Sequence, residues 1–141
     1  MSMPDRAARV LLVEDDLGLA GIIERHLCAR GHDARSAASV EDAIDLLRAG
    51  FRPTVVLLDI NLPGASGWNL LRGPELAAAG SPPVYVVSAT SIPTARLREF
   101  NVAGFLPKPF ALPTLVDVVE RTHPTDEGAA EAVPGGNLDA L

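Results

Sequence analysis

The sequence predicts an α/β fold in which helices cover both faces of a five-stranded parallel sheet. Residues 55–58 (VVLL) form a continuous apolar run bounded by turn residues, as in a strand that is buried on both faces. Short apolar runs alternate along the chain with stretches of helical periodicity, which is the element order of parallel sheets. With 141 residues, 48% of them apolar and 21% charged, the chain has the size of one globular domain.

The first half of the chain is predicted to hold three strands and two helices. In order, these are a strand at residues 9–13, a helix at 17–30, a strand at 33–36, a helix between 39 and 50 and a strand at 55–59. Gly31 is suited to the end of the first helix. Ser39, with Asp42 three positions later, resembles a capping box and therefore marks the start of the second helix.

The second half continues the alternation. The predicted elements are a helix at residues 68–79, a strand at 84–88, a helix at 92–101, a strand at 103–106 and a helix at 112–122. The pair Gly73–Pro74 should bend or break the first of these helices. Pro113 is tolerated in the last helix because the N–H that it lacks would have no partner in a first turn.

Right-handed crossovers between five such units give a doubly wound, flavodoxin-like (βα)5 fold with the strand order 2-1-3-4-5. We expect a domain at residues 9–123, preceded by an N-terminal extension at 1–8. Residues 124–141 lack periodicity and predict a disordered tail. The formal net charge is −6, but four acids and no base follow His123, which leaves 14 acids against 12 bases in residues 1–123.

Composition excludes several classes of function. No cluster of basic residues suggests direct binding of nucleic acid, and no apolar run approaches the roughly 18 to 20 residues that a membrane helix needs. The N-terminus lacks the apolar core of a signal peptide, and one cysteine, Cys28, cannot form an internal disulfide, so we expect a cytoplasmic protein. Cys28 is predicted to be buried, and His26, His32 and His123 have no metal-binding spacing and no predicted function.

Polar residues follow four of the predicted strands: Glu14 and Asp15 the first, Asp59 the third, Ser88 the fourth and Lys108 the fifth. Each alone has a simpler explanation, such as acids in a first helical turn or a hydroxyl bonded to nearby backbone. Their joint placement at one edge of the sheet is what indicates a site. Carboxylates about 4 Å apart repel by roughly 4 kcal/mol per pair at an effective dielectric constant near 20, so this cluster favours a cation, and its hard oxygen donors suit Mg²⁺.

A carboxylate beside Mg²⁺ can attack phosphorus and form an aspartyl-phosphate, and Asp59 is the candidate nucleophile. Glu14 and Asp15 would then bind the metal. The three equatorial phosphoryl oxygens could be shared among Mg²⁺, Ser88 and Lys108. Lys108 is the one lysine among twelve basic residues, and its compact ammonium suits a phosphoryl oxygen.

Four segments, VLLVEDD, LLDINLPGASGW, VVSAT and GFLPKPF, together resemble the receiver domain of bacterial two-component response regulators, with the architecture of a stand-alone chemotaxis regulator. The resemblance implies that Asp59 takes a phosphoryl group from a sensor histidine kinase or a histidine phosphotransfer protein. It places Asp15, Asp59 and the backbone carbonyl of Asn61 on Mg²⁺, with Glu14 acting through water. It also makes Ser88 and Phe105 switch residues, makes Asn61 and Thr90 rate-modulating, and implies a cis Lys108–Pro109 bond.

The output expected from this resemblance is a changed surface at residues 92–101, 103–106 and 112–122 that binds a protein partner. Because only 18 residues follow His123, we expect no effector domain. The composition described above adds the expectation of no direct contact with nucleic acid and no membrane insertion. One alternative is a receiver fragment of a larger, for example DNA-binding, regulator. An aspartyl-phosphate phosphotransferase is disfavoured, since such enzymes commonly have an acid where Asn61 stands, and a flavodoxin-like ligand-binding module is disfavoured by the 4% aromatic content. We therefore expect a signalling domain and not an enzyme.

Overall fold

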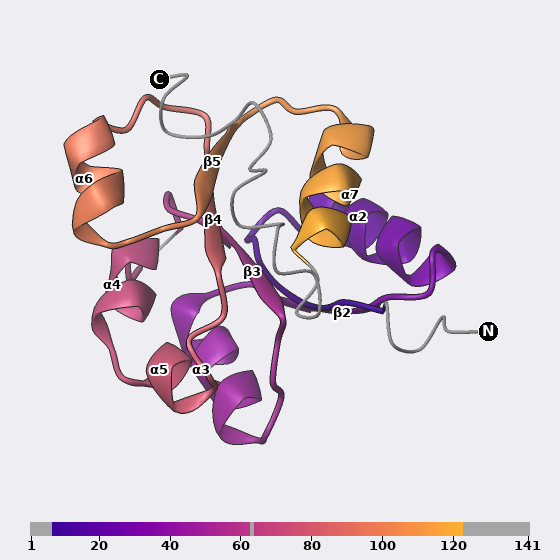
Figure 1. The fold of residues 1–141 in the computed structure, drawn as a ribbon, viewed down its shortest axis with the longest axis horizontal. Helices are drawn as coiled ribbons and strands as arrows, with labels where there is room; N and C mark the ends of the chain where they lie inside the picture. Colours follow the sequence, from indigo (N-terminus) through magenta and orange to yellow (C-terminus); the bar gives the residue numbers. More distant parts are fainter. Residues whose placement is uncertain (1–6, 63, 123–141) are drawn as a thin grey trace.

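The computed structural model describes residues 7–62 and 64–122, which form a parallel sheet between two layers of helices (Figure 1). The strands are β1 (Arg9–Val13), β2 (Asp33–Ala37), β3 (Val55–Asp59), β4 (Val84–Ser88) and β5 (Gly104–Pro107). All neighbouring strands are parallel, in the order β2-β1-β3-β4-β5. The predicted order 2-1-3-4-5 is confirmed, and each predicted strand agrees with the structure to within one residue at either end.

The helices are α2 (Leu17–Ala29), α3 (Val40–Arg48), α4 (Gly67–Arg72), α5 (Glu75–Ala78), α6 (Thr94–Glu99) and α7 (Leu112–Arg121). The start of α3 is confirmed, because Ser39 Oγ accepts a hydrogen bond from the Asp42 N–H at 3.1 Å. The break at Gly73–Pro74 is also confirmed, since it separates α4 from α5.

The helix predicted at residues 92–101 is too long at both ends. Ile92 precedes Pro93, and a residue before proline is pushed out of the helical region, so α6 begins only at Thr94. At the other end Asn101 has a φ of 55°, which stops the helix.

Each face of the sheet packs against its own set of helices. Val10, Leu12, Val55 and Leu57 lie in one core cluster with α2 and α7. The alternate residues of β1 and β3 lie in the other cluster, with residues of α3, α4, α5 and α6. Figure 1 shows these four helices on the opposite side of the sheet from α2 and α7. All five residues of β3 are buried, which confirms that this strand is covered on both faces. The first half of the chain thus builds the central strands that end at the acidic residues.

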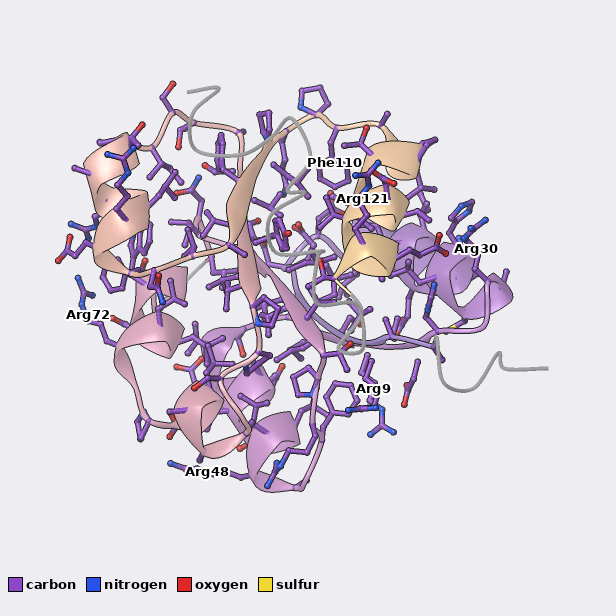
Figure 2. The ribbon with its side chains drawn as sticks, in the orientation of Figure 1. Arg9, Arg30, Arg48, Arg72, Phe110 and Arg121 are labelled. Atoms are coloured by element: carbon purple, nitrogen blue, oxygen red, sulfur yellow. The ribbon has the colours of Figure 1, made fainter. Side chains whose placement is uncertain are left out.

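One prediction made from a single residue is wrong, and another residue has contacts that were not predicted. Cys28 is exposed, because Leu27 takes the buried position on α2 and the next residue lies about 100° around the helix. His32 has a structural function: it is buried, and its Nδ1 accepts the Ala8 N–H at 2.9 Å. Its Nε2 lies 3.0 Å from Glu120 Oε2. Arg30, which Figure 2 labels, donates to the two oxygens of the same carboxylate at 2.7 and 2.9 Å.

The predicted extension at residues 1–8 lies largely outside the described residues, and the predicted tail at 124–141 lies wholly outside them. None of the described helices has both the length and the apolar content that crossing a bilayer requires.

Candidate functional site

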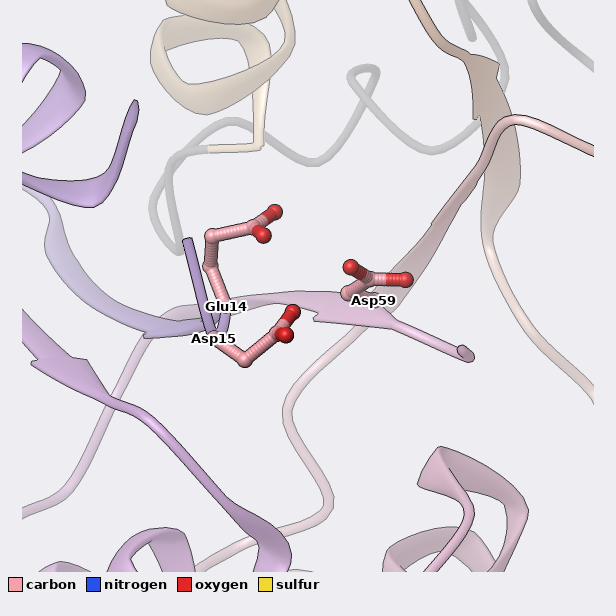
Figure 3. Close-up of side chains that lie close together, drawn as sticks. All are labelled: Glu14, Asp15 and Asp59. Carbon is pink, nitrogen blue, oxygen red and sulfur yellow. The ribbon is translucent and has the colours of Figure 1, made fainter. Parts of the chain in front are cut away.

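The carboxyl ends of β1 and β3 bring three carboxylates together, as the sequence predicted. Glu14 and Asp15 follow β1, and Asp59 is the last residue of the neighbouring strand β3 (Figure 3). One oxygen from each carboxylate lies within 4.8 Å of the others. This point is where the chain order in the sheet reverses, so the connections leave in opposite directions and the strand ends remain accessible.

The three acids differ in burial. Glu14 and Asp59 are only 3% and 4% exposed, whereas Asp15 is exposed. Burial raises the pKa of Glu14 above its usual value, and the nearby charge of Asp59 adds to the rise, while hydrogen bonds from Lys108 and the Asp16 N–H oppose it. Asp15 has no hydrogen-bond or ion-pair partner among the described residues. It is therefore the least compensated charge of the cluster.

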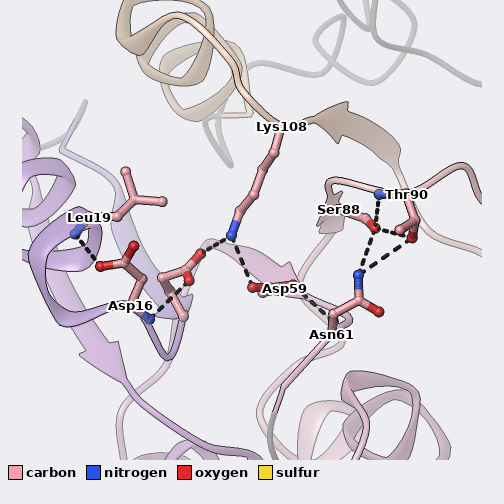
Figure 4. Close-up of polar contacts among 8 residues, drawn as sticks. Asp16, Leu19, Asp59, Asn61, Ser88, Thr90 and Lys108 are labelled. Carbon is pink, nitrogen blue, oxygen red and sulfur yellow. Dashed lines mark hydrogen bonds and ion pairs between the residues drawn. The ribbon is translucent and has the colours of Figure 1, made fainter.

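Lys108 follows β5 and bridges the two buried acids. Its Nζ lies 2.9 Å from Glu14 Oε1 and 3.1 Å from Asp59 Oδ2 (Figure 4). Burial, the largest single influence, lowers the pKa of Lys108, but the hydrogen bonds and charges of the two carboxylates together raise it above its usual value. The lysine stays cationic and offsets one of three negative charges. The remaining charge and the oxygen-only donor set fit a hard metal cation.

Ser88 and Thr90 are joined to Asp59 through Asn61 (Figure 4). The Asn61 backbone N–H donates to Asp59 Oδ1 at 2.9 Å, and its side-chain Nδ2 donates to Ser88 Oγ at 3.1 Å. Ser88 Oγ also accepts the Thr90 N–H at 3.0 Å and lies 3.0 Å from Thr90 Oγ1. Ser88, 1% exposed, is thus held by its neighbours and has no hydrogen bond to Asp59.

The loop that carries Asn61 approaches β3 closely. A Cβ added at Gly67 would lie 2.7 Å from the backbone oxygen of Asp59 and 3.1 Å from the Cα of Ile60. In addition, the Gly67 N–H donates to the Ile60 carbonyl at 3.2 Å. A residue without a side chain is therefore needed at this position for the loop to close over the end of β3.

Phe105, predicted as a switch residue, lies in the apolar core. Its ring is 4% exposed and belongs to the core cluster that contains Val86, Leu97 and Val102. The predicted cis bond between Lys108 and Pro109 is present.

Some contacts near the site were not predicted. The rings of Trp68 in α4 and Phe100 stack with their centroids 4.8 Å apart, and Arg96 of α6 lies over both. The hydrogen bond between Asn61 and Ser88 was also not foreseen. Sequence spacing carries no signal for either contact, because each joins loops or helices that only the folded sheet brings together.

Residues 10–120 match the family description of the response regulator receiver domain. Curated relatives include the response regulator MprA of Mycolicibacterium vanbaalenii, 32% identical over 131 residues, which cover 88% of this chain and 55% of the relative. MprA of Mycobacterium bovis (strain ATCC BAA-935 / AF2122/97) is 30% identical over 139 residues, covering 94% and 59%. The chain thus spans about half the length of the curated relatives it matches.

Solved structures agree. The non-phosphorylated HemR receiver domain from Leptospira biflexa is 30% identical, with a TM-score of 0.72 over 83% of this chain and 94% of that one. The chemotaxis protein CheY4 of Vibrio cholerae is 22% identical and shows a likeness of fold alone, with a TM-score of 0.74 over 82% and 98%. With its family match, its relatives and its strand order, the chain belongs to the receiver domains of two-component response regulators.

Proposed function

We propose that Asp59 is the phosphoryl acceptor and that the donor is a phosphohistidine on a sensor histidine kinase or a histidine phosphotransfer protein. The observation that carries this proposal is the fixed position of the Asp59 carboxylate, which binds Asn61 and Lys108 inside the acidic cluster. A carboxylate oxygen forms a bond to phosphorus while the phosphorus–nitrogen bond breaks. The electron pair of the broken bond stays on the imidazole of the donor. If the imidazole leaves as an anion, it then takes up a proton.

We assign a Mg²⁺ site to Asp15, Asp59 and the backbone carbonyl of Asn61, with Glu14 acting through water. The support is the close approach of the three carboxylates and the lack of a partner for Asp15 among the residues that the structure describes. When bound, Mg²⁺ supplies positive charge at one phosphoryl oxygen.

Lys108 and Ser88 are assigned to the other phosphoryl oxygens. The Lys108 ammonium already lies 3.1 Å from Asp59 and needs little movement to meet a group attached there. Ser88 must first exchange its present hydrogen bonds with Asn61 and Thr90. Because Asn61 and Thr90 hold Ser88 and Asn61 also binds the acceptor, we assign these two residues an influence on the rates of phosphorylation and dephosphorylation.

The proposed output is a change of the surface formed by α6, β5 and α7, which then binds a protein partner. Ser88 and Phe105 are the proposed switch residues. The chain would act in the cytoplasm and promote only its own phosphorylation and dephosphorylation. The alternative is that the chain is the receiver part of a longer regulator, for example a DNA-binding one. This alternative is compatible with the curated relatives, because the chain spans about half of their length.

The test is phosphorylation of Asp59→Asn. We expect the parent to gain one phosphoryl group from acetyl phosphate and Mg²⁺, seen by intact mass and removed by alkali, and the variant to gain none. Asp16→Asn is the matched control, because Asp16 is a neighbouring exposed acid that caps α2, a position that asparagine also fills. Labelling that persists in Asp59→Asn at another residue would overturn the assignment.

A further inference from the structure

Two arginines and two aromatic rings form an accessible surface where α4 meets α6. The rings of Trp68 and Phe100 stack with their centroids 4.8 Å apart. The guanidinium carbon of Arg72 lies 5.2 Å from the centre of the Phe100 ring, and that of Arg96 lies 5.0 Å from the centre of the Trp68 ring. None of these four side chains is buried. We call them the arginine–aromatic surface.

The two guanidiniums of this surface keep their positive charge. Arg30 and Arg48 each pair with a glutamate. Arg72 and Arg96 have no carboxylate partner among the described residues. Cation–π contacts orient a guanidinium and leave N–H groups at its edge that can bind a carboxylate. Together α4 and α6 contain three arginines and one glutamate, a charge of +2 in a chain whose formal net charge is −6. The surface therefore attracts an acidic ligand.

We infer that the acidic segment at residues 124–134 of the same chain docks on the arginine–aromatic surface. This segment lies outside the described residues, and its sequence is PTDEGAAEAVP. It contains three acids, Asp126, Glu127 and Glu131, and no base. The small apolar residues beside these acids can lie against the two rings. Because the segment is joined to the domain, its effective concentration at the surface is on the order of millimolar, and a weak contact is sufficient.

The end of α7 lies close enough to this surface for the segment to reach it. Thr122 Oγ1, directly after α7, lies 3.5 Å from the hydroxyl oxygen of Tyr85. Tyr85 pairs with Gly104 across β4 and β5, and Phe100 precedes Gly104 by four residues, at most about 14 Å of chain. The nine residues from Thr122 to Glu131 span about 30 Å when extended. The acids can therefore pass the β5 edge of the sheet and meet α6.

Docking of this segment would be an autoinhibitory contact. The segment would cover part of α6, which belongs to the proposed output surface. Another protein that binds α6 would then have to displace the segment first. The docking itself goes beyond the proposed function and does not depend on phosphoryl transfer.

The contact is tested in the full chain with a spin label. Cys28 is the one cysteine, so Cys28→Ser removes it and Ala130→Cys supplies a single attachment site between the acids. We expect the label to cause a loss of amide NMR intensity in α4 and α6, and none in α2 on the opposite face of the sheet. Added salt should restore the intensity, because salt screens a contact between exposed charges.

Matched variants test which groups make the contact. A charge-neutral variant keeps the length of the segment and replaces its acids by amides, as Asp126→Asn, Glu127→Gln and Glu131→Gln. This variant should recover the amide intensity, and so should Arg72→Gln combined with Arg96→Gln. Arg25→Gln is the control, because Arg25 is an exposed arginine of α2. It should show the same loss of intensity as the parent.

The affinity is measured with a peptide of residues 123–135, added to the charge-neutral variant so that the segment of the chain does not compete. Trp68 is the one tryptophan, and its fluorescence reports on the surface. We expect a saturable change of fluorescence. Arg96→Gln should raise the half-saturating peptide concentration about fivefold, and Arg25→Gln should leave it within about twofold.

Three results would overturn the inference: full amide intensity in the spin-labelled parent, a loss of intensity that persists in the charge-neutral variant, or equal effects of Arg96→Gln and Arg25→Gln. Isotope-labelled protein mixed with spin-labelled protein that carries no isotope provides a further check. A loss of intensity in that mixture would assign the contact to a second copy and would also overturn docking within one chain. No measurement here uses phosphorylation, so the inference is decided whether or not Asp59 accepts a phosphoryl group.

Discussion

At the scale of single residues, the charges of the acidic cluster are compensated unequally. Lys108 binds both Glu14 and Asp59, whereas Asp15 has no cationic partner among the described residues. Neutralising Asp15 therefore relieves repulsion without breaking an ion pair. Neutralising Asp59 relieves repulsion too, but it weakens a buried contact with Lys108.

We predict that Asp15→Asn raises the free energy of unfolding by about 1 kcal/mol in buffer with EDTA. The value is small because Asp15 is exposed, and solvent weakens its repulsion with the other carboxylates. Asp59→Asn should raise the free energy of unfolding by a smaller amount. With Mg²⁺ the difference should shrink or reverse, since a bound cation stabilises the folded parent. Chemical denaturation in EDTA and in Mg²⁺ measures both effects.

Asp16→Asn serves as the control for a general loss of negative charge and should leave the free energy of unfolding nearly unchanged. If Asp15→Asn is less stable than the parent in EDTA, the three carboxylates do not repel one another as their separation implies.

A second charged cluster fixes α7 far from the acceptor. Glu120 binds Arg30 at 2.7 and 2.9 Å and the buried His32 at 3.0 Å. The hydrogen bond from Arg30 is the main cause that lowers the pKa of Glu120 from 4.5 to about 2; burial opposes it and the His32 contact adds to it. The folded state therefore binds a proton at Glu120 less readily than the unfolded chain does. The stabilisation is present above pH 4.5 and is lost as the pH falls toward 2.

We predict that Glu120→Gln lowers the free energy of unfolding at pH 7 by about 1 kcal/mol, a modest value because Arg30 and Glu120 are partly exposed. The difference between variant and parent should shrink as the pH falls from 4.5. Asp117→Asn removes an exposed pair within α7 itself and should have a smaller effect. A difference that stays constant down to pH 3 would contradict the assigned pKa.

At the scale of elements, the prediction of the sheet from sequence was accurate because β1, β3 and β4 contain continuous apolar runs with clear ends. β2, with the sequence DARSA, has no such run. The same logic placed Glu14, Asp15, Asp59, Ser88 and Lys108 at one edge, where the structure has them. The errors arose where a local rule was outweighed or overlooked. A proline shortened α6, and the rotation of one residue around α2 exposed Cys28.

Contacts between elements were less predictable. The path from Asp59 through Asn61 to Ser88 depends on how two loops approach each other, and the stacking of Trp68 on Phe100 depends on the distance between α4 and α6. Neither distance is encoded in local periodicity. The partnership of His32 with Glu120 joins residues 88 positions apart for the same reason.

The loop between β3 and α4 gives a prediction at this scale. Gly67→Ala should lower the free energy of unfolding by about 2 kcal/mol or more, because its Cβ meets rigid backbone of Asp59 at 2.7 Å. Phosphorylation by acetyl phosphate should slow as well, since the loop holds Asn61 against Asp59. Thermal melting and intact mass measure the two effects.

Gly18→Ala is the control, because its Cβ would meet only a side-chain oxygen of Asp16 at 3.4 Å. In the first turn of α2 an alanine should be neutral or stabilising. A Gly67→Ala protein as stable as the parent would mean that the loop accommodates the added atom without strain.

At the scale of the whole molecule, the proposed function has two parts, phosphoryl transfer and output, and the hydrogen bonds of Ser88 concern the second part. In that proposal, phosphoryl transfer would concern Asp59, Lys108 and a bound metal, whereas output would require Ser88 to leave Asn61 and Thr90 for the phosphoryl group. Ser88 ends β4, next to β5, whose Phe105 packs into the core with Leu97 of α6. In the proposed switch, movement of Ser88 would be transmitted through β5 to the surface of α6, β5 and α7. A local charge that biases two arrangements of one loop is sufficient for a switch.

We predict that beryllofluoride, which stands in for the phosphoryl group on Asp59, shifts amide NMR signals from Ser88 through Phe105 and into α7. Ser88→Ala should still accept a phosphoryl group from acetyl phosphate but lose most of the distant shifts, because it lacks the hydroxyl that draws the loop inward. Thr90→Ala is a useful comparison: it removes one contact of Ser88 and keeps the hydroxyl itself, so the distant shifts should persist. Shifts confined to the neighbours of Asp59, or an unchanged pattern in Ser88→Ala, would show that the signal does not leave the site through β4 and β5.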